Sequence, residues 1–214
     1  MSTQISEPPV VAVQQIADPG PLGLAGFAMT TFVLSVFNTN MLNSSLDAAV
    51  LPLALFYGGL AQLLAGMWEF RKGNTFGATA FASYGAFWLS FYWLVTYDAA
   101  HLAPAADAHK AVGVFLLAWA IFTLYMTVAA MRTSGAVLAV FVALTIAFIL
   151  LAIGKFATGN AAKDWTHFGG WVGVLTALLA WYASFAGVTN ATWGRSVIPT
   201  WPMTTPVARS RPVR

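Results

Sequence analysis

Few side chains in this sequence could carry out chemistry, because the chain contains three histidines, seven acidic residues and no cysteine. A zinc hydrolase needs paired ligands such as HExxH, and no such pattern includes His101, His109 or His167. A serine hydrolase needs a GxSxG-like turn or a Ser and a His held together, and Ser134-Gly135 offers neither. Without cysteine there is no thiolate ligand, disulfide or cysteine nucleophile. We therefore expect no enzyme, no metal site and no cofactor.

Polar residues nevertheless recur at helical spacing within apolar stretches. Gly58, Gln62, Gly66 and Glu69 are separated by four, four and three positions, which places them on one face of a helix. Two interpretations of this face stay open. It is either a close-packed helix seam with one hydrogen-bonding Gln62, or a pore wall that Gln62 lines.

A second amphipathic face carries Phe27, Thr30, Leu34 and Asn38 at spacings of three and four. Its hydroxyl and amide fit a polar pathway, but Thr30 could equally bond back to its own helix. Tyr84 stands within another aromatic-rich stretch. A buried Tyr hydroxyl in a membrane needs a partner on a neighbouring helix or in a wet cavity.

Three ionisable residues stand near the ends of apolar stretches. We expect Glu69 to be an interfacial group just before Arg71 and Lys72, and Lys155 to extend outward from the end of its helix. His167 opens the last apolar stretch. An interfacial hydrogen-bonding role and a proton-relay role are both open for it.

The elements that must position these residues are long apolar helices. Hydrophobic residues make up 59% of the 214 positions and charged residues only 8%, against about a quarter charged in an ordinary soluble domain. So few charges cannot cover a water-soluble surface, so lipid must surround the protein. The net charge of +3 comes without a basic, aromatic-interleaved cluster, so we do not expect a nucleic-acid partner.

The sequence predicts an all-α polytopic membrane protein, because each span needs roughly 20 apolar residues. We expect a polar N-terminal tail over residues 1–21, a transport domain over 22–190 and a basic C-terminal tail over 191–214. Turn-rich stretches such as Thr158–Thr166 separate the spans. Six transmembrane helices per protomer are predicted, over Leu22–Asn40, Leu51–Glu69, Phe76–Tyr97, Ala111–Met131, Ala136–Lys155 and His167–Asn190.

The distribution of basic residues predicts the orientation. With six spans, both termini and the second and fourth loops share one face, which then holds Arg71, Lys72, Arg132, Arg195, Arg209, Arg211 and Arg214. The opposite face holds Lys110, Lys155 and Lys163. By the positive-inside rule both termini are cytoplasmic, and we expect the protein in the inner (plasma) membrane.

Several motifs, in order along the chain, resemble one known family. The stretch that leads into the first span, Asp18-Pro19-Gly20-Pro21-Leu22-Gly23-Leu24, is similar to the NPAPLGL signature of the acetate uptake transporter family, which includes bacterial succinate-acetate permeases and yeast acetate and ammonium exporters. The resemblance covers nearly the whole chain, from Asp18 to Pro199. It continues through residues 56–62 (FYGGLAQ), 73–77 (GNTFG), 83–85 (SYG), 151–154 (LAIG) and 167–171 (HFGGW).

The resemblance implies a six-helix protomer in a homohexamer, with a pathway in each protomer. In this family a narrow apolar constriction is built from a Phe, a Tyr and a Leu, which look like Phe27, Tyr84 and Leu144. Ala180 matches a further position that, with Leu144, influences which acids pass.

From these observations we expect transport of acetate and similarly small monocarboxylates, with succinate as a further candidate. Thr30, Thr31, Asn38, Gln62 and the Tyr84 hydroxyl would supply hydrogen bonds along the pathway. A channel and a proton-coupled carrier both fit, since the protonated acid crosses an apolar neck more easily than the anion. A channel for neutral molecules such as ammonia or urea, and a scaffold whose small residues serve packing alone, are the alternatives.

Two departures from the family pattern concern charge. Asp18 replaces the Asn that usually begins the signature and adds a carboxylate that would repel an anion. Lys155 stands where an uncharged Asn is expected, and a cation there could attract carboxylates or extend to the interface.

Overall fold

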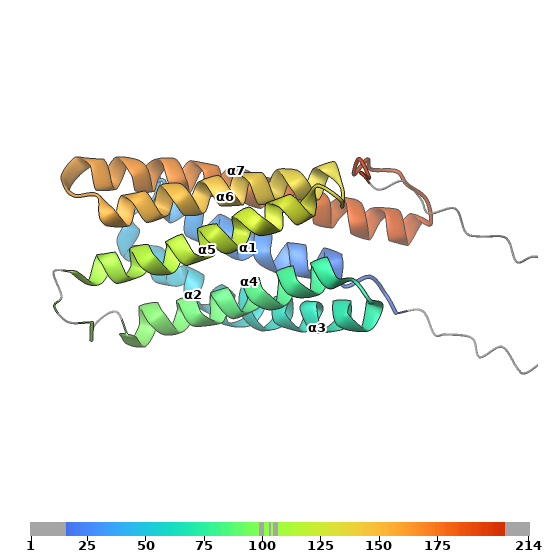
Figure 1. Cartoon of the computed structure of the whole chain (residues 1–214), viewed down its shortest axis with the longest axis horizontal. Helices are drawn as coiled ribbons and strands as arrows, with labels where there is room; N and C mark the ends of the chain where they lie inside the picture. Colours follow the sequence, from blue (N-terminus) through green and yellow to red (C-terminus); the bar gives the residue numbers. More distant parts are fainter. Residues whose placement is uncertain (1–15, 99–100, 103, 105–106, 204–214) are drawn as a thin grey trace, which may run out of the picture.

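A computed structural model of the chain describes residues 16–98, 101–102, 104 and 107–203. The apolar stretches of the sequence form long helices that run side by side along the longest axis (Figure 1). The helical elements are α1 (Gly20–Asn38), the 3₁₀ turn η1 (Ser44–Val50), α2 (Leu51–Leu55), the π-helix η2 (Phe56–Ala61), α3 (Gln62–Lys72), α4 (Thr75–Trp93), the π-helix η3 (Leu94–Asp98), α5 (Ala108–Ala130), α6 (Gly135–Phe156) and α7 (Gly159–Trp193).

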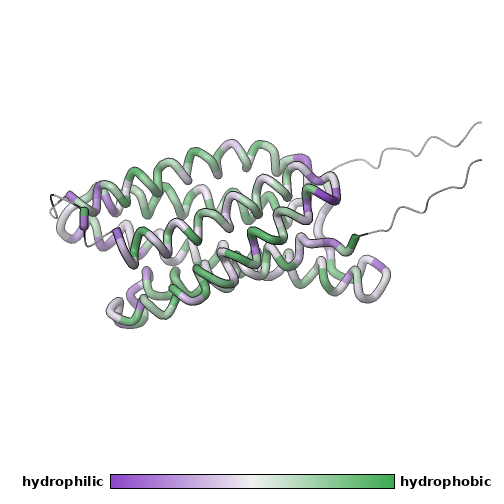
Figure 2. The backbone as a smooth tube through the Cα atoms, turned by 90° about the horizontal axis from the view of Figure 1, so that it is seen from below, coloured by the Kyte–Doolittle hydropathy of each residue, from purple (hydrophilic) through white to green (hydrophobic). Residues whose placement is uncertain are grey.

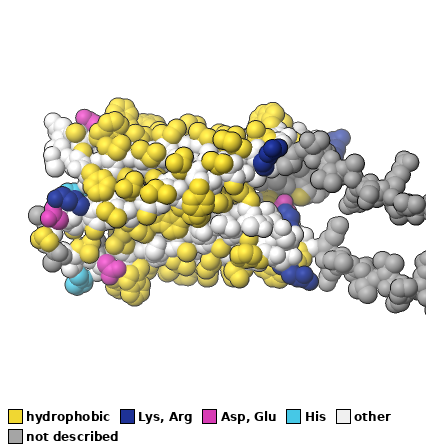
Figure 3. Space-filling view, viewed as in Figure 1, with side chains coloured by type: hydrophobic (Ala, Val, Ile, Leu, Met, Phe, Trp, Pro, Cys, Tyr) yellow, Lys and Arg dark blue, Asp and Glu magenta, His cyan; other side chains and the backbone are white. Residues whose placement is uncertain are grey.

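The expectation of an all-helical membrane protein is confirmed. Among the described residues the one strand-like pairing is an isolated bridge between Ser134 and Pro202. Five helical stretches are long and apolar enough to cross a bilayer, namely α1, the continuous run Ser44–Lys72, α5, α6 and α7. Hydrophobic residues run along the length of the helices and hydrophilic ones concentrate near their ends (Figure 2), and the charged side chains on the face drawn in Figure 3 lie at the two ends of the molecule.

The connection expected over Thr158–Thr166 is wrong, because α7 already begins at Gly159. Gly159 has a φ of +62°, which lets the chain turn back sharply after α6. After Asn160, Ala161 and Ala162 continue the helix well. The helix therefore extends well beyond the apolar stretch that predicted it.

The two ends of the described chain lie at the same end of the bundle, which we call the terminal end (Figure 1). The Ser184 hydroxyl, near the end of α7, donates to the Pro21 carbonyl at the start of α1 at 2.7 Å. The C-terminal segment also closes over the start of α6, where Gly135 N donates to Trp201 O at 2.8 Å. The start of α1 and the segment around Trp201 are thus packed onto the bundle.

The small-residue faces pack inside the protomer. A Cβ on Gly66 would collide with the backbone of Ala82 on α4, and a Cβ on Gly173 would collide with Ser35 on α1. These glycines therefore serve close approach between helices of one chain.

Candidate functional site

Four cavities form a row along the bundle, because each shares wall residues with the next. At the terminal end is the terminal cavity, of about 230 Å³. It shares Leu24 and Phe141 with the neck, a space of about 20 Å³. The neck shares Phe27 and Leu144 with the middle cavity, of about 50 Å³. Asn38 lines both the middle cavity and the vestibule, of about 780 Å³ at the opposite end.

The neck is the narrowest part of the row. Phe27, Tyr84 and Leu144 all line it and are buried. The ring centroids of Phe27 and Tyr84 are 5.8 Å apart. Since a water molecule needs roughly 10–15 Å³ of such space, the neck has room for about one water in this conformation. The structure thus brings together the three residues expected to form a constriction.

The Tyr84 hydroxyl has a partner on α5, at 2.9 Å from Thr123 Oγ1. The Thr123 hydroxyl donates in turn to the Trp119 carbonyl at 2.7 Å. Thr123 therefore accepts, and Tyr84 donates, in the bond between them. The sequence could not identify Thr123 as this partner. Because the Tyr84 hydroxyl proton is donated to Thr123, it is not free to bond to a solute in the neck.

The polar residues expected along the pathway divide into two groups. Gln62 lines the neck, Thr31 lines the middle cavity, and Asn38 lines the middle cavity and the vestibule. Thr30 is fully buried and lines none of these four cavities. Its hydroxyl donates to Gly26 O at 2.9 Å, which is the bond to its own helix that the sequence left open as an alternative. Thr30 instead packs against η2, where Gly58 leaves room for it.

Ala180 also lines none of the four cavities of the row. It is fully buried on α7 and belongs to the same core cluster as Phe27 and Leu144. Its side chain can therefore affect the neck only through the packing of its neighbours.

The buried polar atoms of the described residues that have no hydrogen-bond partner all belong to the row. They are Thr31 Oγ1, Gln62 Oε1, Glu69 Oε2 and Trp88 Nε1. Glu69 lines the terminal cavity, Gln62 the neck, and Thr31 and Trp88 the middle cavity. A buried polar group without a partner costs about 1–3 kcal/mol. The four residues all line the row, although these particular atoms are themselves enclosed by protein.

Glu69 and Trp88 are pathway-lining residues that the sequence did not reveal. Glu69, expected near the membrane interface, lies at the terminal end of the bundle but is only 1% exposed. The turn after α3 folds over it, and a Cβ on Gly77 would lie 2.8 Å from its carboxyl carbon. Asn74, the N-cap of α4 just after α3, is the one sequence feature that could have indicated that the chain turns back over the end of α3.

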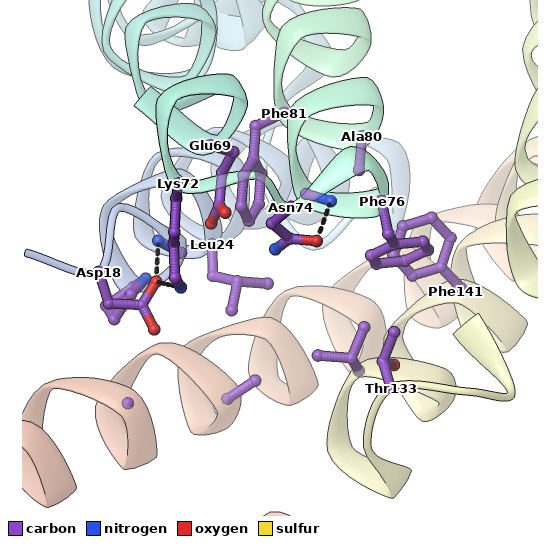
Figure 4. Close-up of a pocket in the computed structure, with 16 residues that line it drawn as sticks. Asp18, Leu24, Glu69, Lys72, Asn74, Phe76, Ala80, Phe81, Thr133 and Phe141 are labelled. Carbon is purple, nitrogen blue, oxygen red and sulfur yellow. Dashed lines mark hydrogen bonds and ion pairs between the residues drawn. The ribbon is translucent and has the colours of Figure 1, made fainter. Parts of the chain in front are cut away.

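Asp18 does not stand as an isolated carboxylate at the terminal cavity. Its Oδ1 lies 2.8 Å from Lys72 Nζ and accepts from Gly20 N at 2.9 Å (Figure 4). The charge of Lys72 therefore offsets the extra negative charge that the sequence predicted to repel anions. In Figure 4 Lys72 and Glu69 both come from the end of α3 and lie next to each other, with Asp18 beside Lys72.

The signature residues anchor the start of α1 around this cavity. Pro19 precedes the helix and is buried, and Pro21 accepts the Ser184 bond from α7. Gly23 lets α1 approach α4, since a Cβ there would lie 2.6 Å from the Phe81 ring. Leu22 points outward and is 46% exposed.

The vestibule is the polar end of the row. Lys155, Lys163, His109 and His167 line it together with the single carboxylate of Asp47. Lys155 thus faces a cavity at the point where the family pattern has an uncharged residue.

Lys110, at the same end, is paired elsewhere. It forms an ion pair with Asp107, and its hydrogen bond holds the pKa of the Asp107 carboxyl below its usual value. Lys110 does not line the vestibule.

Known proteins are similar to this chain over most of its length. Residues 3–205 match the GPR1/FUN34/yaaH family. The succinate-acetate/proton symporter SatP of Escherichia coli (strain K12) is 43% identical over 185 residues, covering 86% of this chain and 95% of the relative. The ammonia transport outward protein 2 of Saccharomyces cerevisiae is 43% identical over 183 residues, covering 83% of this chain and 64% of the relative.

A solved structure agrees with these relatives. The bacterial acetate channel SatP has a TM-score of 0.79 to this structure at 42% identity, with 87% of this chain and 99% of that chain covered. The matches confirm the resemblance found from the signature at residues 18–24 and the motifs that follow it. The chain belongs to the GPR1/FUN34/yaaH family.

Proposed function

We propose that this protein carries acetate and similarly small monocarboxylates across a membrane through the row of cavities in each protomer. The observation that carries the proposal is the apolar neck of about 20 Å³ with unpartnered buried polar atoms on both of its sides. Polar groups on either side would take over part of the hydration of a small acid, and the neck would exclude larger ones. The relatives named for acetate transport support the substrate.

In this proposal Phe27, Tyr84 and Leu144 form the constriction, and Gln62, Thr31 and Asn38 are the polar lining. Ala180 contributes to selectivity indirectly, through the packing of the core cluster that it shares with Phe27 and Leu144. Succinate is the next candidate substrate, since a relative is named for it.

The neck also bears on the transport mechanism, which is either that of a channel or that of a proton-coupled carrier. One relative is named a proton symporter and one solved structure a channel. We propose that the neutral acid crosses the neck in preference to the anion, because an ion loses hydration there. Uptake would then increase with an inward proton gradient in either mechanism.

The proposed topology has six spans, of which α4 and η3 together form the third. The protein lies in the plasma membrane, and both termini are in the cytoplasm. Because the chain has no cysteine, single cysteines at Asn160 and Thr192 report each end separately. We expect them to react with an impermeant maleimide from opposite sides. Reaction from one side alone would overturn this topology.

We also propose a homo-oligomer, with six copies as the resemblance implies. The exposed large side chains along η2 and α3, such as Phe56, Leu60 and Leu64, fit lipid or a second copy. Native mass spectrometry in mild detergent tests this assembly, and monomers alone would contradict it.

A second candidate is conduction of ammonia, which one relative's name favours. Uptake of labelled acetate into vesicles containing the protein separates the two. Acetate uptake inhibited by propionate but not by ammonium or urea supports the proposal. Ammonia flux without acetate uptake supports the alternative.

A further inference from the structure

The neck is too narrow for acetic acid in this conformation. Its space of about 20 Å³ holds about one water, and acetic acid is several times larger than a water molecule. At least one wall of the neck must therefore move when the acid crosses. Helix α6 contributes Val140, Phe141 and Leu144 to the neck, and its first turns line the terminal cavity through Val137. A shift at the start of α6 would thus act on both spaces.

The start of α6 is held by a segment from the far end of the described chain. We call this segment, residues 199–203, the strap, and Figure 1 shows it in red beside the start of α6. Gly135 N donates to Trp201 O at 2.8 Å, and Ala136 N donates to Thr200 O at 3.2 Å. The first N–H groups of a helix have no partner within it. The strap therefore caps α6 with carbonyls from outside the helix.

The strap also contacts the wall of the terminal cavity. Met203 N donates to Thr133 O at 3.0 Å, and Thr133 lines this cavity from the turn between α5 and α6 (Figure 4). Ser134 and Pro202 form an isolated antiparallel bridge beside this bond. The turn is therefore fastened to the strap on both sides of Ser134. A movement of the strap would be passed on directly to Thr133 and to the first residues of α6.

On its other side the strap is attached to α7. The Tyr182 hydroxyl donates to Pro199 O at 2.6 Å, and the Tyr182 ring stacks on Trp201 with centroids 5.9 Å apart. Just before the strap, the Asn190 amide donates to Ile198 O at 2.8 Å. The strap is therefore a short connection from the end of α7 to the start of α6.

The strap combines backbone strain with little burial. Trp201 has a φ of +52°, in the left-handed region that is unfavourable for a bulky side chain. Trp201 and Met203 are 58% and 44% exposed, so little apolar burial keeps the strap in place. A segment held by a few backbone hydrogen bonds and little buried surface opens at a low free energy.

We propose that the strap is a latch on α6. While it is seated, the start of α6 is fixed and the neck stays narrow. Its release frees the turn at Thr133 and the first turns of α6, so that Val140 and Phe141 can move away from Phe27 and an acid can cross. Release also relaxes the backbone of Trp201, which offsets part of the hydrogen bonds that are lost. This inference rests on the proposed function, and it adds the moving element that the narrow neck requires.

A reversible crosslink tests the latch, because the chain has no cysteine of its own. Ser134 and Pro202 are paired between the strap's hydrogen bonds, an arrangement in which antiparallel Cα atoms lie about 4.5 Å apart and a disulfide can form. The double variant Ser134→Cys with Pro202→Cys should take up labelled acetate when reduced. We expect it to lose most of this uptake when oxidised, and to regain it with dithiothreitol. Each single variant, treated with the same oxidant, is the matched control and should keep its uptake.

Hydrogen exchange gives a second reading that uses the wild-type protein and stands even if the double variant folds poorly. The Gly135 and Ala136 amides should exchange faster than those in the middle of α6, because they are exposed each time the strap opens. Tyr182→Phe removes the bond between α7 and the strap and should make both amides exchange faster still.

Two results would overturn the latch. One is unchanged acetate uptake after the disulfide has formed, as shown by the loss of free thiols. The other is protection of Gly135 and Ala136 equal to that of the middle of α6, in both the wild type and Tyr182→Phe. Absence of acetate uptake by the wild type would instead overturn the proposed function, while amide exchange would still report whether the strap opens.

Discussion

The Tyr84 hydroxyl on α4 donates to Thr123 Oγ1 on α5 at 2.9 Å, and so fixes one wall of the neck from a helix that the signature motifs do not include. The Tyr84 ring also lies among Phe27, Phe122 and Phe141, with centroids between 5.4 and 6.0 Å away. The neck is therefore held by a hydrogen bond and by aromatic packing together.

Removing the hydroxyl of Tyr84 and removing that of Thr123 should reduce the stability of the protein by different amounts. Thr123→Val leaves the Tyr84 hydroxyl buried without a partner, which should reduce the free energy of unfolding by about 1–3 kcal/mol. Tyr84→Phe leaves Thr123 still bonded to the Trp119 carbonyl and should cost less, about 1 kcal/mol. Thermal unfolding in detergent measures both. Equal losses, or a larger loss for Tyr84→Phe, would contradict the direction assigned to the bond.

Leu144→Ala should widen the neck, so that lactate is taken up in addition to acetate. If Leu144 only packs, the same change leaves a cavity worth about 2–5 kcal/mol and lowers the amount of folded protein without changing selectivity. Uptake of both acids, normalised to folded protein, separates these outcomes. Ala180→Gly is expected to change the lactate-to-acetate ratio less, because Ala180 lines no cavity of the row. A ratio unchanged in Leu144→Ala at normal expression would exclude it from the selectivity neck.

The Asp18–Lys72 pair predicts opposite effects for its two members. Asp18→Asn frees the Lys72 charge beside the terminal cavity and should increase the apparent affinity for acetate about two- to fivefold at low salt. Lys72→Gln leaves Asp18 uncompensated and should decrease it by a similar factor. Both effects should shrink as salt screens the charges. Efflux assays that present acetate to the terminal end measure them, and changes of the same sign would show that the pair does not set this local charge.

Lys155 is expected to concentrate anions in the vestibule. Lys155→Gln should increase the KM for acetate supplied at that end about two- to fivefold in low salt, and high salt should remove the difference. Lys110→Gln is the matched control, since Lys110 is paired with Asp107 and lies outside the vestibule walls.

The Lys110–Asp107 ion pair, on which the control depends, should remain formed at the pH of this assay. The lowered pKa of Asp107 keeps its carboxylate charged even at pH values below those at which an ordinary Asp is protonated, so the pair is present at neutral pH and is lost only as the pH falls through the lowered value. An equal effect of both variants would indicate a general surface charge and not the vestibule.

The helices could be predicted from the sequence because apolar length reflects the bilayer directly, whereas Phe27, Tyr84 and Leu144 were assigned to the neck through the family resemblance. The Gln62 face shows the limit of such reasoning. Gly66 packs against α4 while Gln62 lines the neck, so the packing and pore-wall interpretations each describe part of one face. The π-helix η2, which precedes Gln62, adds a residue to the turn and shifts which side chains share a face.

Thr30 and Trp88 could not be assigned from the sequence for a related reason. Whether a Thr hydroxyl bonds to its own helix or faces a cavity depends on the neighbouring helix, here η2 with Gly58. Trp88 reads as one more aromatic residue in α4, and only the packing of α1, η2 and α4 shows that its N–H lacks a partner.

The claim that acetate passes through the neck within the chain is tested most directly by filling that neck. Leu144→Trp places a bulky side chain in a space of about 20 Å³, whereas Val142→Trp adds the same side chain at a position on α6 that is 43% exposed. Uptake of labelled acetate into vesicles, normalised to folded protein, should be abolished by the first change and remain within about twofold of wild type for the second. Equal uptake by both variants at wild-type levels would contradict a pathway through the neck.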